Sequence, residues 1–83
     1  MKASLSQFAL VAGRFADELF ADILQEFIDY AERAEPESGL YIGARWFLLE
    51  SERAYPFACH GAGIDGGRLR EHLRERFEEK ALS

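Results

Sequence analysis

The sequence has almost none of the cross-links that hold very small proteins together. Its 83 residues include one cysteine, Cys59, so no disulfide can form within the chain. A chain of this length buries only about 60–65% of its unfolded surface, and such chains commonly depend on a disulfide, a metal or a partner subunit. A lone cysteine without a secretory signal is typical of a reducing compartment. We therefore expect a cytoplasmic protein.

Long hydrophobic runs are also missing. The apolar run over residues 8–12 is followed at once by charged residues, so it is too short for a signal segment or a membrane span. The chain shows no internal repeat and no low-complexity tract. We expect one soluble domain over residues 1–83 that does not associate with membranes.

Basic residues are few. Ten Lys and Arg stand against 15 Asp and Glu, which gives a net charge of −5. Binding to a nucleic-acid backbone needs clustered Lys and Arg, so the composition argues against it. The acidic excess lies mostly within residues 1–35.

Residues 4–35 predict one long helix that is kinked at Gly13, and a separate buried piece over residues 7–12 is the alternative. Ser4 and Gln7 form a capping box at its start, and Pro36 ends it. From residue 14 onward the pattern has a helical period, with acidic residues opposite an apolar face. We call Glu18, Asp22, Asp29 and Glu32 the acidic stripe, and the apolar face comprises Leu19, Phe20, Ile23, Phe27, Tyr30 and Ala31.

Residues 40–59 favour an antiparallel hairpin. Two runs rich in aromatic and branched residues, 40–49 and 54–59, flank a short polar stretch. Pro56 cannot donate to a strand ladder, so the second strand should lie at an edge. Both faces of the first strand are apolar, which leaves a helix over residues 44–55 as the alternative.

Residues 60–67 predict a glycine-rich loop, and residues 66–81 predict an amphipathic helix with Asp65 as its N-cap. The apolar side of that helix carries Leu69, Leu73, Phe77 and Ala81. The order of helix, hairpin and helix defines an α+β fold, and an all-α helical bundle is the alternative.

The loop contains the spacing G-x-G-x-x-G at Gly61, Gly63 and Gly66. A dinucleotide-binding fold needs a further parallel strand after the helix, and the sequence given ends there. A weaker possibility is a small-anion site, in which the free amides at the helix start act together with Arg68 or Arg70.

Chemistry at Cys59 has little support. His60 is its neighbour and would point to the opposite face of a strand, and His72 lies outside any recognised metal-ligand spacing. We expect no catalytic residues, no metal and no cofactor.

The apolar content is high. Seven Phe, three Tyr and one Trp exceed what a single layer of this predicted fold would cover. Large exposed apolar patches mark protein interfaces, and a symmetric dimer is the simplest way to cover one. We expect a non-catalytic interaction module, a homodimer that binds a protein with a basic patch, in the role of an inhibitor (immunity-like or phage anti-defence-like) or an adaptor. A small-anion-binding domain is the alternative, and the expected apolar contacts are Phe20, Phe27, Tyr41 and Trp46.

Overall fold

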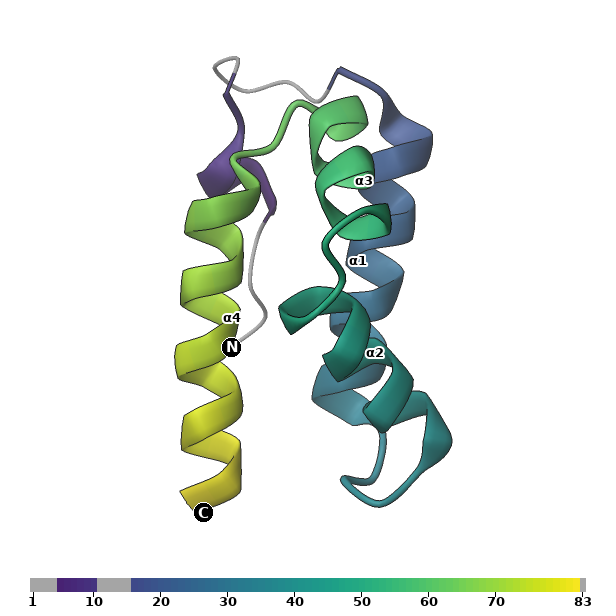
Figure 1. Cartoon of the computed structure of the whole chain (residues 1–83), viewed down its shortest axis with the longest axis vertical. Helices are drawn as coiled ribbons and strands as arrows, with labels where there is room; N and C mark the ends of the chain where they lie inside the picture. Colours follow the sequence, from purple (N-terminus) through teal and green to yellow (C-terminus); the bar gives the residue numbers. More distant parts are fainter. Residues whose placement is uncertain (1–4, 11–15, 83) are drawn as a thin grey trace.

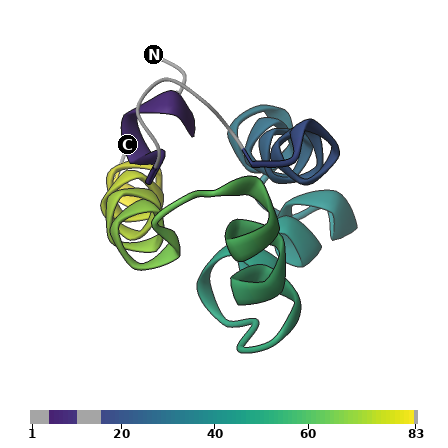
Figure 2. The same cartoon turned by 90° about the horizontal axis from the view of Figure 1, so that it is seen from above.

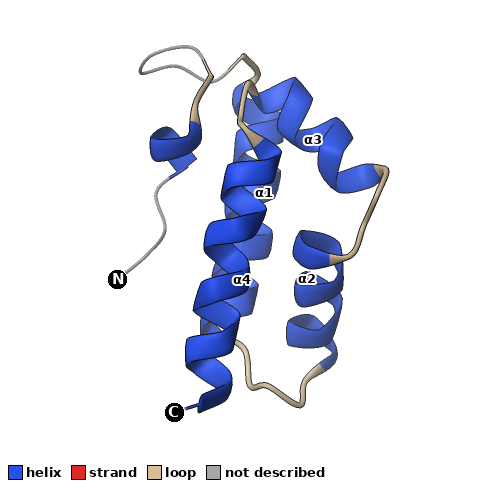
Figure 3. Ribbon diagram, turned by 60° about the vertical axis from the view of Figure 1, so that its left-hand side comes forward, coloured by secondary structure: helices blue, strands red, loops and turns tan. Residues whose placement is uncertain are grey.

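Four α-helices and one short 3-10 helix make up the fold. The computed structural model describes residues 5–10 and 16–82. Within these ranges there is no strand (Figure 3), only an isolated bridge between Ala9 and Ile64. The predicted α+β fold is therefore wrong, and the alternative of an all-α bundle is confirmed. The elements are η1 (Leu5–Phe8), α1 (Glu18–Arg33), α2 (Gly39–Leu49), α3 (Ala54–Ala62) and α4 (Gly66–Leu82).

The helices form two parts that enclose a common core. α1 packs along both α2 and α3, while α4 packs against α2, α3 and η1. Seen from above, α4 and η1 lie on one side and the other three helices on the opposite side (Figures 1 and 2). The molecule is elongated, with extents of 34 × 22 × 18 Å.

The predicted hairpin is replaced by α2 and α3. The Ser38 hydroxyl accepts a hydrogen bond from the Tyr41 amide at 3.2 Å and caps α2. Ala44, Phe47, Leu48 and Leu49 are buried, whereas Leu40, Ile42 and Trp46 of α2 are exposed. Because this outer face is apolar as well, the sequence resembled a strand with two apolar faces. Pro56 lies in the first turn of α3, where a helix needs no amide donor.

The N-terminal segment is not one long helix. η1 ends at Phe8, and α1 begins at Glu18 after the N-cap Asp17, whose Oδ1 accepts from the Leu19 amide at 2.9 Å. Gly13 and Ser4 lie outside the described residues, so neither the kink nor the capping box is tested.

The buried face of α1 is also rotated from the predicted one. Its centre is formed by Ala21, Leu24, Ile28 and Ala31. Phe20 and Phe27 flank this face and are only partly buried, while Leu19 is exposed. Of the predicted apolar face, only Ala31 belongs to this buried centre.

The C-terminal helix is confirmed. Leu69, Leu73 and Phe77 of α4 are buried, and the Asp65 carboxylate accepts from the Arg68 amide at 3.2 Å, as an N-cap does. The side chain of Ala81 is outside the described part.

Arg70 of α4 closes the end of α2. Its Nε donates to the Leu48 carbonyl at 2.8 Å, and its Nη2 donates to the Ser51 carbonyl at 2.7 Å. The guanidinium carbon also lies 4.1 Å from the centre of the Tyr55 ring. The last carbonyls of a helix have no intrahelical partners, so one forked cation satisfies groups that would otherwise need water.

η1 is tied to the turn between α3 and α4. The Asp65 amide donates to the Phe8 carbonyl, and the Leu10 amide donates to the Gly63 carbonyl, each at 2.7 Å. Leu5 and Phe8 are buried, so η1 covers part of the core beside α4. Among the described helices, none is long and apolar enough to cross a membrane.

Candidate functional site

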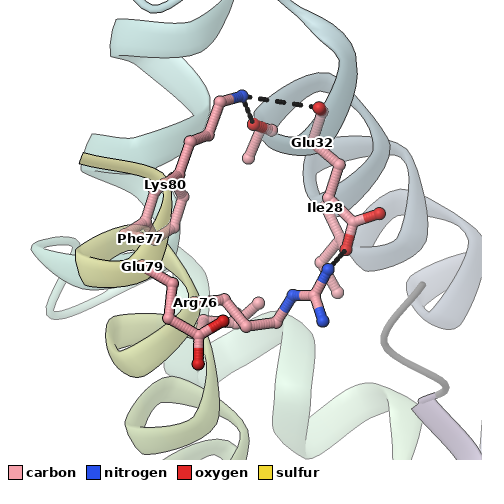
Figure 4. Close-up of a pocket in the computed structure, with 8 residues that line it drawn as sticks. Ile28, Glu32, Arg76, Phe77, Glu79 and Lys80 are labelled. Carbon is pink, nitrogen blue, oxygen red and sulfur yellow. Dashed lines mark hydrogen bonds and ion pairs between the residues drawn. The ribbon is translucent and has the colours of Figure 1, made fainter. Parts of the chain in front are cut away.

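One cavity lies between α1 and α4 and has a volume of about 520 Å³ (Figure 4). Its apolar wall is made by Ile28 and Ala31 of α1 with Leu73 and Phe77 of α4. Four charged side chains surround this wall: Glu32, Arg76, Glu79 and Lys80.

Most charges of this larger cavity already have partners within the chain. Arg76 Nη2 lies 3.1 Å from Glu32 Oε1, an ion pair whose alignment does not make a hydrogen bond. Lys80 Nζ donates to the Ala31 carbonyl at 2.9 Å and to the carbonyls of Glu32 and Ala34 at 3.4 Å. These contacts join α1 to α4 where apolar packing is thin. The cavity is therefore a gap between two helices that Arg76 and Lys80 connect.

A second cavity, of about 310 Å³, lies where α3 ends and α4 begins. Among the described residues that line it, the ionisable ones are Tyr55, Cys59, His60 and Arg70, and none is a carboxylate. Gly66 and Gly67 bring the first turn of α4 to the same cavity. Apolar contacts come from Leu10, Pro56 and Ile64.

Hydrogen-bond donors without partners converge on this second cavity. The first amides of a helix have no intrahelical acceptor, and within the described ranges no acceptor is found for Gly66 or Gly67. The positive end of the helix dipole lies there too. The His60 ring is exposed and has no hydrogen-bond partner in the described part. Asp65 provides a nearby negative charge, which reduces the positive potential at these donors. Its carboxylate accepts a hydrogen bond from the Arg68 amide and not from the amides of Gly66 and Gly67.

Two buried ionisable groups, Tyr55 and Cys59, line the second cavity in their neutral forms. Burial raises the pKa of the Tyr55 phenol, and its hydroxyl donates to the Gly66 carbonyl at 2.7 Å. Burial also raises the pKa of the Cys59 thiol, although Tyr55 and Arg70 act in the opposite direction. Both groups are therefore neutral at neutral pH. A thiolate is the nucleophilic form, so this environment suits binding better than thiol catalysis.

The glycine spacing has a packing explanation. A Cβ on Gly61 would lie 2.5 Å from Phe20 Cδ2, and Gly63 has φ +69 at the end of α3. A Cβ on Gly66 would lie 3.2 Å from Cys59 Sγ. Of the predicted anion loop, only Gly66 lines the cavity, and Arg68 is exposed elsewhere. Arg70, which the sequence analysis weighed beside Arg68, does line the cavity. Gly67 was not singled out, and His60 was weighed only as a catalytic or metal-binding group.

The four residues of the acidic stripe differ in their exposure and in their partners. Glu18 and Asp22 are exposed, whereas Asp29 is half-buried and accepts a hydrogen bond from Gln25 at 3.1 Å. Glu32 faces α4 and pairs with Arg76, as described above. Only the first half of the predicted stripe is therefore an open surface.

The four predicted apolar contact residues also differ in how far they are buried. Phe27 stacks on Phe47 with ring centres 4.1 Å apart, and Phe20 and Tyr41 also pack against the core. Trp46 is different, because 59% of it is exposed on the outer side of α2. The other large exposed apolar residues are Leu10, Leu19, Tyr30, Leu40, Ile42 and Phe57.

No group of three or more potential metal ligands occurs among the described residues. Comparison with protein-family models, with curated proteins and with solved structures found no match to this chain. The functional argument therefore depends on the geometry of the two cavities and of the exposed surface.

Proposed function

We propose that the protein binds a small anion in the cavity between α3 and α4. The observation that carries this proposal is the composition of the cavity: two free helix amides, the His60 ring and the Arg70 guanidinium converge, with no carboxylate among the described lining residues. Helix N-termini and basic side chains are common ligands of phosphate, sulfate and carboxylate groups. The volume of about 310 Å³ is at the lower limit of ligand sites, which suits a small oxyanion.

The test is a titration with inorganic phosphate, followed by the amide resonances of Gly66 and Gly67 in NMR spectra. Asp65→Asn keeps an N-capping side chain but removes the adjacent negative charge, so it should tighten binding by about two- to fivefold. His60→Gln should weaken binding, because it removes the imidazole from the cavity lining.

Arg74→Gln is the matched control, because Arg74 is exposed on α4 and does not line the cavity. It removes one positive charge and should leave phosphate binding unchanged. Resonance shifts spread over the whole surface, or an equal effect of Arg74→Gln and His60→Gln, would show that phosphate interacts with general surface charge and would reject the site.

A second candidate is binding to a macromolecule, in the role of an inhibitor, an immunity-like or phage anti-defence-like protein, or an adaptor. The observation that favours it is the exposure of Trp46 on α2 and of Phe57 on α3, at 59% and 68%. Exposed aromatic side chains often anchor protein interfaces. The same surface suits a homodimer, and the lone thiol of Cys59 suits the cytoplasm.

Light scattering at micromolar concentration tests the homodimer. Trp46→Asp changes an exposed side chain, so the variant should stay folded and become monomeric if Trp46 lies in the dimer interface. A wild-type protein that is monomeric at high concentration would exclude the homodimer and leave a different partner as the only occupant of this surface.

A further inference from the structure

The outer edge of α1 carries two adjacent rows of side chains that are not part of the buried core. Leu19, Ile23 and Tyr30 form an apolar row at spacings of four and seven residues, which places them on one side of a helix. Glu18, Asp22 and Glu26 form an acidic row next to it, at spacings of four residues. We call these six residues the α1 edge.

Exposure shows that the apolar row is open. Leu19 is 65% exposed, Tyr30 is 37% exposed, and Ile23 is half-buried. Phe57 of α3 extends the surface, because it is 68% exposed and makes an edge contact of 5.4 Å with Phe20, the neighbour of Leu19. The buried face of α1 points away, toward α2, α3 and the core.

The acidic row has no counter-charge within the described ranges. Glu18 and Asp22 make no ion pair, and Glu26 only accepts a hydrogen bond from the Tyr30 hydroxyl at 2.8 Å. Like charges four residues apart on a helix repel each other. No ion pair among the described residues offsets this repulsion. Single exposed apolar residues are ordinary, whereas an apolar row bordered by uncompensated charge is the pattern of a recognition surface.

We propose that the α1 edge docks a basic amphipathic helix. This inference rests on the second candidate function, binding to a macromolecule, and it names the chemistry of the partner. Apolar side chains of the partner helix would cover Leu19, Ile23 and Phe57, and its flanking Lys or Arg side chains would meet Glu18, Asp22 and Glu26. A second copy of this chain is a poor occupant, because two α1 edges would bring acidic rows together. A nucleic acid is excluded by the same charge.

The experiment uses a synthetic helical peptide of leucine and lysine, about 14 residues or four helical turns long, with leucines on one face. Its binding to the full chain is measured by calorimetry at low and high salt. The peptide should bind, and binding should weaken as salt shortens the Debye length from about 10 Å at 0.1 M to about 3 Å at 1 M. A matched peptide of leucine and glutamate should not bind.

Two variants locate the contact. Leu19→Ser changes an exposed residue and should weaken binding about tenfold, as loss of an apolar anchor does. Asp22→Asn with Glu26→Gln should weaken it about three- to tenfold and remove most of the salt dependence. The control is Glu75→Gln with Glu78→Gln on exposed positions of α4, which removes the same charge and should leave affinity within twofold.

Equal weakening by the α4 control and the α1 pair would overturn the proposal, because acidity alone would then attract the peptide. Loss of binding on Trp46→Ser, with Leu19→Ser unchanged, would also overturn it. That second result would move docking to the outer side of α2 and leave the second candidate function intact. No binding of either peptide would overturn the proposal for basic helices, while the light-scattering test of the Trp46 surface would stand independently.

Discussion

Two helical glycines allow a test of whether local propensity or tertiary packing decides a residue. Gly43 lies in α2 and Gly61 in α3, and alanine favours a helix over glycine by about 1 kcal/mol in both cases. A Cβ on Gly43 would meet nothing within 4 Å. A Cβ on Gly61 would lie 2.5, 2.8 and 2.9 Å from Cδ2, Cε2 and Cγ of Phe20. The two substitutions should therefore change stability in opposite directions.

The expected magnitudes follow from these distances. Gly43→Ala should stabilise the protein by about 0.5–1 kcal/mol, because only the helix propensity changes. Gly61→Ala forces the whole Phe20 ring to move, since even its Cγ is too close. Overpacking of this kind costs about 1–3 kcal/mol, and disturbing the contact between Phe20 and Phe57 adds about 0.5–1.5 kcal/mol. After the gain in propensity, the net destabilisation should be about 0.5–3.5 kcal/mol.

Urea unfolding followed by circular dichroism measures both values, with the m-value checking that the transition stays two-state. Shortening Phe20 to leucine should remove much of the penalty of Gly61→Ala, and a double-mutant cycle between the two positions would record the coupling. If Gly61→Ala stabilised the protein as much as Gly43→Ala, the close packing of α1 on α3 at Phe20 would be refuted.

Further predictions concern the residues around Tyr55. Arg70→Met should destabilise the protein by about 2–4 kcal/mol in urea unfolding, because it leaves the carbonyls of Leu48 and Ser51 without their charged donor. Arg70→Lys should recover only part of this loss of stability. If Arg70→Met destabilised the protein by less than about 0.5 kcal/mol, the capping role of Arg70 would be contradicted. The raised pKa of Tyr55 stabilises the fold fully below about pH 10, and this contribution should fall as the pH rises further, by up to about 1.4 kcal/mol per unit. Tyr55→Phe should flatten that alkaline slope in melts between about pH 10 and 11.5, and an unchanged slope would assign it to other groups. Cys59 should react with a thiol reagent at pH 8 much more slowly in the native protein than in urea, because it is 2% exposed and burial raises its pKa.

Sequence reasoning succeeded where a short-range pattern and a cap agreed. The C-terminal helix carries Leu69, Leu73 and Phe77 at regular spacing behind an Asp65 cap, and both features depend only on neighbouring residues. Ser38 caps α2 in the structure, but the sequence analysis did not consider it as a cap and followed the run of aromatic and branched residues after it. Composition could not show that Trp46 and Ile42 stay outside the core. A strand was therefore inferred from residues that form the exposed side of a helix.

The candidate sites were harder to predict because they depend on distant contacts. Glycine spacing directed attention to the loop beside the proposed anion site, yet Gly61 and Gly63 are explained by Phe20 and by the end of α3. Arg70 lies twenty or so residues from the carbonyls it binds, and no local pattern distinguishes it from Arg68 or Arg74. The division of the acidic stripe likewise depends on which of its members faces α4.

The attachment of η1 to the turn between α3 and α4 has a consequence for the order of folding. The Phe8 carbonyl finds its partner, the Asp65 amide, only after α1, α2 and α3 have been made. Closing a loop of that length is slow relative to forming helices and pairing neighbouring ones, so the contact belongs late in the reaction. During synthesis Leu5 and Phe8 leave the ribosome before the turn and helix that cover them. A nascent chain of this protein therefore exposes these apolar side chains until α4 is complete.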